Sequence, residues 1–325
     1  MMATPALSLK DAVVRYDRLS AVDGVSLELR RGETLGLVGE SGCGKSSLAR
    51  AIVGLQPLSA GTLSIEGEML QDVAAPRRVA LQRKIQLLFQ DPAASLSPRM
   101  TVRSLLAEPL KIRKAYTSGS WARILALAEG IGLGAQLLQR YPHQLSGGQA
   151  RRVALVRALA AGPSIVLADE PTAGLDISVQ GELLNLLRAL RDSLGLGYLL
   201  ISHNLNVVGR VTDRVMVMYL GQIVESGPTA TLFRTPAHPY TQALLSANLT
   251  LDPRRRRERI VLSGELPSPG DPPAGCRFHK RCPLAQPRCA NEAPVLQEGA
   301  GGRSVACHFP LAAAEPAVVL QAIAG

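Results

Sequence analysis

Residues 39–47 have the composition and spacing of a loop that binds phosphate. They read G-x-x-x-x-G-K-S-S and stand between a predicted strand over 34–38 and a predicted helix over 45–53. Successive backbone N–H groups of such a loop converge on an anion, at the positive end of the following helix. Lys45 should reach the β- and γ-phosphates, and the Ser46 hydroxyl should ligate Mg²⁺. We predict a nucleoside triphosphate site; the alternative is a plain glycine-rich turn. The predicted nucleotide-binding residues are Gly39, Ser41, Gly42, Cys43, Gly44, Lys45, Ser46 and Ser47.

An acidic pair, Asp169 and Glu170, follows the apolar run 165–168. A phosphate loop needs an aspartate at the end of a neighbouring strand for the Mg²⁺ shell, and Asp169 fits that role. Glu170 comes one residue later, where a carboxylate could polarise the attacking water as a general base. Taken alone, the pair could equally cap a helix. Its place after a phosphate loop and a buried strand favours the catalytic interpretation.

A second glycine-rich stretch, residues 145–149, reads LSGGQ and opens a predicted helix over 147–161. The free N–H groups of the helix start and the Ser146 hydroxyl would make a second anion site. The alternative is a serine N-cap with a flexible helix start. The residues of this stretch are Leu145, Ser146, Gly147, Gly148 and Gln149.

The elements that must position these residues alternate between strands and helices. This rhythm predicts an α/β fold, with a parallel sheet flanked by helices. Period-two alternation over 7–16 and 25–29 predicts a further, antiparallel sheet. Residues 102–139 are helical in period, and prolines crowd the chain beyond residue 227. The buried strands are predicted at 34–38, 85–89, 164–168 and 198–201, and the main helices at 45–53, 147–161 and 178–194.

The order of the three motifs resembles the ATP-binding cassette (ABC) family. G-x-x-x-x-G-K-S comes first, LSGGQ second and the apolar strand with Asp-Glu third, and the resemblance covers roughly residues 7–227. It implies an ATPase of the P-loop NTPase fold, with a RecA-like parallel sheet, an antiparallel β subdomain and a helical subdomain at about 91–162. The expected domains are a nucleotide-binding domain over 1–250 and a small Cys- and Pro-rich C-terminal domain over 251–325.

Further residues match motifs of that family. Gln90 resembles the glutamine loop, Asp176 the D-loop and His203 the switch histidine that contacts the γ-phosphate. Tyr16 resembles the aromatic residue that stacks on adenine, although a surface tyrosine on a strand is an ordinary alternative. The resemblance implies that Glu170, His203 and Gln90 are catalytic and that Mg²⁺ is held through Ser46, Gln90 and Asp169.

Two anion-binding loops in one chain also suit a dimer, in which one partner's phosphate loop and the other's LSGGQ enclose ATP. In such families the dimer closes on ATP and opens after hydrolysis, which drives a transporter. Closing is favourable because the γ-phosphate gives charge-assisted hydrogen bonds to both halves.

Residues 91–103 and the segment 236–245, which contains H-P-Y, resemble the ATPases of oligopeptide and dipeptide importers, particularly their F-type subunit. Related importers carry nickel, glutathione or opine-type solutes, so these stay as alternatives. The resemblance implies a second ABC ATPase subunit in a homo- or heterodimer and two transmembrane permease subunits. It also implies an extracytoplasmic solute-binding protein and no nucleic acid partner.

Four of the five cysteines lie in the C-terminal segment. Their number in one short segment of a cytosolic chain argues against disulfides. Four thiolates suit an iron–sulfur cluster or zinc. Because some peptide-importer ATPases carry a [4Fe-4S] cluster on a similar tail, we prefer that cluster over zinc, with disulfides or free thiols as a third option. The predicted ligands are Cys276, Cys282, Cys289 and Cys307.

Composition narrows the function classes. The chain has 325 residues, 46% hydrophobic residues and a net charge of +10, but no apolar stretch of the roughly 20 residues that a spanning helix needs. We expect a protein peripheral to the cytoplasmic face of the plasma (inner) membrane. A nucleic-acid maintenance ATPase is disfavoured, because Gln90 and Leu145 are too close for the long arm of such proteins. A regulatory module without turnover is disfavoured by the presence of Glu170 and His203.

Overall fold

The computed structural model describes residues 4–17, 19–88, 93–247, 260–262, 264–265, 267–268 and 270–312. Backbone contacts divide the chain into two compact units. The first unit contains residues 1–7, 29–33 and 65–199, and the second contains residues 8–28, 34–64 and 200–325. The domain boundary predicted at residue 250 lies outside the described residues.

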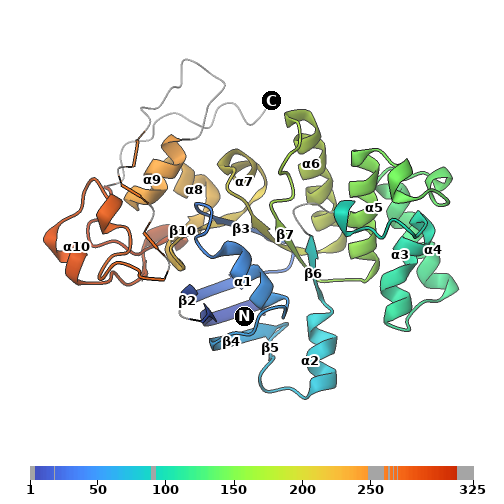
Figure 1. Ribbon diagram of the computed structural model, residues 1–325, viewed down its shortest axis with the longest axis horizontal. Coiled ribbons are helices and arrows are strands. Elements are labelled where there is room, and N and C mark those ends of the chain that lie inside the picture. The colour runs from blue at the N-terminus through green and yellow to red at the C-terminus, as the bar shows by residue number, and fades with distance from the viewer. Residues whose placement is uncertain are drawn as a thin grey trace. The chain divides into compact units, whose positions relative to one another are not determined.

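The second unit is built on a sheet in which β3 (Thr34–Val38) pairs in parallel with β9 (Arg214–Tyr219). All five residues of β3 are buried, which is the pattern of a central strand covered on both faces. β9 pairs antiparallel with β10 (Gln222–Pro228), and the order continues to β12 (Ser304–Val305) and β11 (Gln297–Glu298). The helices of this unit are α1 (Lys45–Ile52), α7 (Leu205–Val211), α8 (Thr229–Arg234), α9 (Pro239–Ser246) and α10 (Pro287–Asn291) (Figure 1).

A smaller sheet contains β2 (Leu19–Leu29), β1 (Leu7–Tyr16) and β4 (Ala60–Ile65), in this order. In β2 the alternation predicted over 25–29 is visible as burial: Val25, Leu27 and Leu29 are buried, while Ser26 and Glu28 are exposed. The additional sheet is therefore confirmed, with a β2 that begins earlier than its apolar pattern does.

In the first unit β6 (Ile85–Leu88) pairs in parallel with β7 (Ile165–Asp169). The described residues before β7 also form β5 (Glu68–Met69), α2 (Ala75–Gln82), α3 (Val102–Ile112), α4 (Ser118–Gly130) and α5 (Gly147–Ala160), besides short 3₁₀ turns. α6 (Ile177–Leu194) follows β7, and β8 (Gly197–Ile201) has residues in both units. The helical segment predicted over 102–139, with its breaks, corresponds to α3, α4 and the short turns after them.

Local chemistry explains where these helices begin. The Thr101 hydroxyl accepts a hydrogen bond from the N–H of Ser104 at the start of α3, and Thr117 forms a capping box with Ser120 at the start of α4. α3 and α4 both pack against α5 (Figure 1). Arg157 of α5 also forms an ion pair of 2.7 Å with Glu108 of α3.

The cysteine-rich segment has little regular structure and does not form a separate core. Its described residues include two 3₁₀ turns, His279–Arg281 and Ala300–Gly302, and the short helix α10. Phe278 is its largest fully buried side chain, and this ring packs against Tyr219 and Tyr240, with centroid distances of 5.3 Å to each. The predicted separate C-terminal domain is therefore not confirmed, because the segment takes its core from β9 and α9. Among the described residues, no helix is sufficiently long and apolar to cross a membrane.

Candidate functional site

The phosphate loop predicted over 39–47 lies between β3 and α1 in the second unit. Gly39 and Gly44 have φ angles of 157° and 109°. A Cβ atom on Gly39 would lie 2.2 Å from the carbonyl oxygen of Met218, and one on Gly44 would lie 2.2 Å from that of Ala21. Only glycine fits at these two positions, so the loop follows a path that its sequence specifies.

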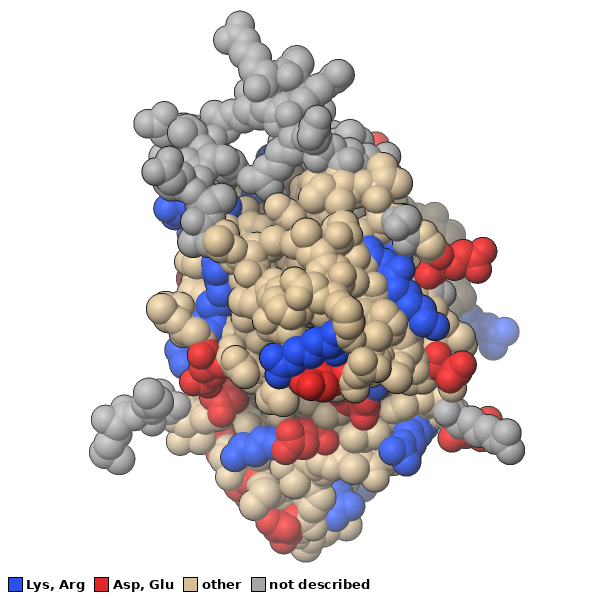
Figure 2. All heavy atoms as spheres, turned by 90° about the vertical axis from the view of Figure 1, so that its left-hand side faces the viewer, with Lys and Arg blue, Asp and Glu red and all other residues tan. Residues whose placement is uncertain are grey.

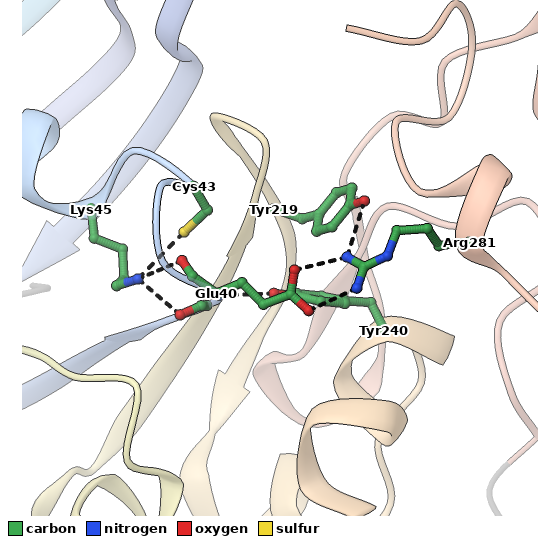
Figure 3. Close-up of polar contacts among 7 residues, drawn as sticks. Glu40, Cys43, Lys45, Tyr219, Tyr240 and Arg281 are labelled. Atoms are coloured by element: carbon green, nitrogen blue, oxygen red, sulfur yellow. Dashed lines mark hydrogen bonds and ion pairs between the residues drawn. The ribbon is translucent and has the colours of Figure 1, made fainter. Parts of the chain in front are cut away.

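Lys45 is buried at the start of α1. Its ammonium group donates to the carbonyl oxygens of Gly39 and Glu40, at 2.8 Å each (Figure 3). The positive charge is therefore held on the inner side of the loop, beside the N-terminus of a helix. This is the arrangement that a polyphosphate requires. Ser41, Gly42 and Ser46 are exposed, and Ser47 is half-buried.

Cys43 places a thiol group inside the loop. It is 1% exposed, and burial raises the pKa of its thiol above the ordinary value despite the nearby Lys45 charge. A protonated, enclosed thiol is a packing group rather than a nucleophile. The burial of this side chain favours a packing role for the thiol, and the assignment of Cys43 to the nucleotide-binding loop stays a prediction.

The acidic pair belongs to the first unit. The first four residues of β7 are buried, and Asp169 and Glu170 are half-buried at its carboxyl end. Glu170 has a φ angle of 51°, a left-handed conformation that is unusual for a non-glycine residue. Such strain is typical of side chains whose direction matters for function. Asp176 is exposed and occupies the N-cap position of α6.

The LSGGQ stretch forms the start of α5. The Ser146 hydroxyl accepts from the N–H of Gln149 at 3.3 Å, and the Gln149 amide oxygen accepts from the N–H of Ser146 at 3.1 Å. This is a capping box, so the structural alternative is correct as geometry. It does not exclude the anion site, because the hydroxyl keeps its own proton to donate. Leu145 is half-buried, and Ser146, Gly147 and Gly148 are exposed.

Two other predicted residues lie in the second unit. His203 is exposed and follows the buried Ser202 at the end of β8. Tyr16 ends β1, and its buried hydroxyl lacks a hydrogen-bond partner in the part of the chain that the structure describes. Gln90 lies outside the described residues.

Sequence reasoning missed a set of contacts that the C-terminal segment makes with the phosphate loop. Arg281 forms a forked ion pair with Glu40, a residue not assigned a role from the sequence. The Tyr240 hydroxyl accepts a hydrogen bond from the N–H of Glu40. Glu40 and Arg281 are 241 positions apart, so no local pattern could have indicated the pair. Tyr240 belongs to the H-P-Y motif, which served only for the family resemblance and did not predict a contact with the loop.

The four cysteines of the C-terminal segment line one cavity of about 10 Å³, together with Phe278 and His238. The four predicted ligands Cys276, Cys282, Cys289 and Cys307 therefore lie around one cavity, and their role as ligands stays a prediction. The cavity has room for about one water-sized particle, which is small for a four-iron cluster.

Metal ligation at these cysteines is not supported. Among the described residues, no group of three or more His, Cys, Asp or Glu side chains is arranged to hold a metal ion. Burial raises the pKa of Cys276 to about 11 and also raises the pKa of Cys282 and Cys307. A metal that binds these thiols would therefore release protons, and its affinity would fall as the pH falls.

Comparison with protein families gives two matches. Residues 22–173 match the model described as ABC transporter, and residues 224–289 match the one described as oligopeptide/dipeptide transporter, C-terminal region. The second match includes Cys276, Cys282 and Cys289.

Whole-length relatives are similar to the chain at nearly half of their positions. A putative oligopeptide transport ATP-binding protein of Bacillus subtilis is 46% identical over 95% of this chain and 97% of its own length. A dipeptide transport ATP-binding protein of Haemophilus influenzae is 45% identical over 92% of this chain and 91% of its own length. An oligopeptide transport ATP-binding protein of Escherichia coli is 46% identical, over 89% and 87%.

Solved structures with a similar fold are also ATP-binding cassettes. The cbiO1 protein of Clostridium perfringens, part of an ABC transporter complex, has a TM-score of 0.65 at 26% identity and covers 71% of this chain and 91% of its own. A dimeric cassette bound to ADP and Pi has a TM-score of 0.59 at 28% identity, covering 69% and 98%.

Proposed function

Because this chain belongs to the ABC transporter family of ATP-binding proteins and is an ATPase, we propose that it powers the import of oligopeptides or dipeptides. The observation that carries the proposal is the combination of a phosphate loop, with Lys45 held inside it, and whole-length similarity to peptide transport ATP-binding proteins.

In this proposal each predicted residue has one task. The backbone of residues 39–47 and the Lys45 ammonium bind the β- and γ-phosphates, and Tyr16 stacks on adenine. Ser46, Gln90 and Asp169 would hold Mg²⁺, which neutralises phosphate charge when bound. Glu170 accepts a proton from the attacking water, and His203 contacts the γ-phosphate.

The remaining part of the site comes from a second subunit. Residues 145–149 of one subunit would contact the γ-phosphate held by the other, and Asp176 would lie at their interface. Hydrolysis removes the γ-phosphate and with it the differential contact that favours the closed pair. The closing and opening of the ATPase pair would act on two transmembrane permease subunits. An extracytoplasmic solute-binding protein would deliver the solute to these subunits. The chain would then be peripheral, on the cytoplasmic face of the inner membrane.

The cysteines carry a separate proposal, a [4Fe-4S] cluster or, as the alternative, zinc. Its support is that all four line one cavity, and it requires the thiols to move into a ligand arrangement that the described residues do not show. Anaerobic purification followed by iron, sulfide and zinc analysis tests it. Four iron and four sulfide atoms, or one zinc ion, should be present per chain and absent from Cys289→Ala. Metal-free protein with normal ATPase activity would contradict it.

Uptake of labelled peptides tests the main proposal. A host strain that lacks this chain should lose uptake of di- and oligopeptides, the native chain should restore it, and Lys45→Ala should not. Uptake of nickel, glutathione and an opine is measured in parallel. Loss of one of those activities with normal peptide uptake would replace peptide by that solute.

A further inference from the structure

Glu40, the second residue of the phosphate loop, is held from two sides by the C-terminal part of the chain. Its backbone N–H donates to the Tyr240 hydroxyl at 2.9 Å. Its two carboxylate oxygens accept from the two terminal nitrogens of Arg281, at 2.7 and 3.1 Å (Figure 3). Both the main chain and the side chain of this loop residue are therefore fixed by residues outside the loop.

The ion pair has the geometry and burial of a strong one. The Arg281 side chain is 10% exposed and that of Glu40 27% exposed. A forked arginine–carboxylate pair sets orientation as well as distance, and partial burial limits its screening by salt. The Arg281 guanidinium also lies 5.9 Å from the centroid of the Tyr219 ring, which it covers.

Arg281 is backed by a buried aromatic cluster. Tyr219 of β9, Tyr240 of α9 and Phe278 of the cysteine-rich segment form an aromatic cluster, and all three are fully buried. Tyr240 is positioned by its own motif: the N–H of Tyr240 donates to His238 Nδ1 at 3.1 Å, which caps α9, and Pro239 begins that helix. The H-P-Y sequence thus aims a hydroxyl at the phosphate loop.

A second arginine of the same segment supports the loop indirectly. Arg277 forms an ion pair with Asp23 and donates to the carbonyl oxygen of Leu220. The next residue, Gly221, donates its N–H to the Cys43 carbonyl oxygen in the loop, at 2.8 Å. The segment between Cys276 and Cys282 therefore reaches the loop along two routes.

We infer that Arg281 is a positioning residue for ATP binding: it fixes Glu40, and with it the phosphate loop, and it neutralises a carboxylate that the loop would otherwise present to a polyanion. The inference rests on the proposed binding of ATP by this loop. It assigns the cysteine-rich segment a part in nucleotide affinity, in addition to any role of its cysteines.

A purely structural Arg281 and a positioning Arg281 predict different results. If the residue only held the C-terminal segment in place, its loss would lower the thermal midpoint. The Kd for MgATP of the protein that remains folded would then equal that of the native chain. If it positions and neutralises Glu40, its loss weakens MgATP binding in folded protein, and removal of the Glu40 charge restores part of the affinity. Added salt should reduce the difference in Kd between Arg281→Ala and the native chain, because it screens the bare carboxylate.

The experiment is a titration of the purified full-length chain with a fluorescent ATP analogue and Mg²⁺, with the thermal midpoint and kcat and KM for ATP measured on the same samples. Arg281→Ala should raise the Kd about tenfold with a small change in kcat, as expected for loss of ground-state binding. Arg281→Lys has a single ammonium group in place of the two guanidinium nitrogens, so its Kd should lie between those of the native chain and Arg281→Ala. Arg281→Ala combined with Glu40→Gln should bind more tightly than Arg281→Ala alone.

The matched control is Arg288→Ala. Arg288 of α10 forms an ion pair of 2.7 Å with Glu292, the C-cap residue of that helix, and both side chains are 57% exposed. The Arg288→Ala variant removes an arginine–glutamate pair from the same segment without changing a contact of the phosphate loop. Its Kd for MgATP should equal that of the native chain. Should Arg281→Ala not fold, Arg281→Gln takes its place, since it keeps most of the side chain and removes the charge.

The outcomes test the proposed ATP binding and the proposed role of Arg281 separately. A native chain and an Arg288→Ala variant that both fail to bind MgATP would overturn the proposed function. A native chain that binds MgATP and an Arg281 variant with the same Kd would overturn the present inference. A double variant that binds no better than Arg281→Ala would also overturn it, because the neutralising role would then be absent.

Discussion

At the scale of single residues, the catalytic assignment depends on Glu170. Its backbone has a left-handed conformation directly after β7, a strained geometry that is common at functional sites. We expect Glu170→Gln to retain MgATP binding and to lower kcat by about a hundredfold or more, since a positioned general base contributes roughly that factor. Phosphate release and ATP retention are measured on the same protein.

The control for Glu170→Gln is Glu182→Gln. The Glu182 carboxylate lies on α6 in the same unit, and its side chain is 70% exposed. This variant should hydrolyse ATP at the native rate. Unchanged turnover in Glu170→Gln would remove Glu170 from the role of base.

Glu66 allows a prediction about pH and stability in the first unit. It forms ion pairs with Arg31, at 2.5 Å, and with Lys84, and its side chain is 21% exposed. Burial alone raises the pKa of Glu66, but the hydrogen bond from Lys84 and the charges of Lys84 and Arg31 lower it below its ordinary value of 4.5. As the pH falls, the Glu66 carboxylate therefore binds a proton at a higher pH in the unfolded chain than in the folded chain.

Glu66→Gln should lower the free energy of unfolding by about 1 kcal/mol at neutral pH. The difference from the native chain should be full above pH 4.5 and shrink as the pH falls through the lowered pKa of the folded state. Denaturant titrations at several pH values measure it. Glu68→Gln, which removes the more exposed pair with Arg77, should have a smaller effect. A pH-independent difference would contradict the electrostatic explanation.

At the scale of elements, the start of α5 combines a helix cap with a predicted anion site, and substitution can separate the two. Ser146→Ala should cost about 1 kcal/mol of stability, because the cap is lost. Ser146→Asp keeps a capping oxygen and favours the helix dipole, so stability should stay near the native value. Its negative charge should nevertheless lower ATP turnover by tenfold or more, on the order expected for a lost charged contact.

Thermal midpoints and ATP turnover of these two variants decide the matter. Native turnover in Ser146→Asp would show that residues 145–149 cap a helix and do nothing else.

The elements around the site could be predicted because their signals are local. The uninterrupted apolar run of β3, the G-K-S start of α1 and the serine cap of α5 each specify a strand or a helix within a few residues. The fold class followed from their order. Boundaries were less accurate where a polar stretch continues a strand, as at the start of β2.

The contacts of the C-terminal segment could not be predicted from such signals. Arg281 reaches Glu40 and Arg277 reaches Asp23 over more than 240 positions of sequence, 241 and 254 respectively. Their pairing depends on how Phe278 packs against Tyr219 and Tyr240, which is a tertiary property. The composition of the segment suggested a small domain in need of a metal, whereas the structure gives it the aromatic core of its neighbours.

At the scale of the whole molecule, the charge of +10 does not by itself define a partner. On the face in Figure 2, Lys and Arg side chains alternate with Asp and Glu, and no broad patch of one sign is visible. The net charge therefore does not decide between classes of partner, and the similarity to peptide transport ATP-binding proteins is the better guide.

The proposed mechanism also requires two subunits to come together. Glu170→Gln with MgATP should form a dimer, either with itself or with the second ATPase subunit of the same transporter, and MgADP should not support it. Size-exclusion chromatography with light scattering measures the mass. Lys45→Ala is the control and should stay monomeric. A monomer under all conditions, with both candidate partners present, would contradict the two-subunit site.

The most direct measurement for the account as a whole is equilibrium binding of MgATP to the purified chain and to Lys45→Ala, with thermal midpoints to show that both are folded. We predict saturable binding to the native chain and a Kd at least tenfold to a hundredfold higher for Lys45→Ala, because the charged donor inside the loop is lost. A folded native chain without saturable binding, or a Lys45→Ala variant with the native Kd, would contradict the assignment of residues 39–47 as the ATP site.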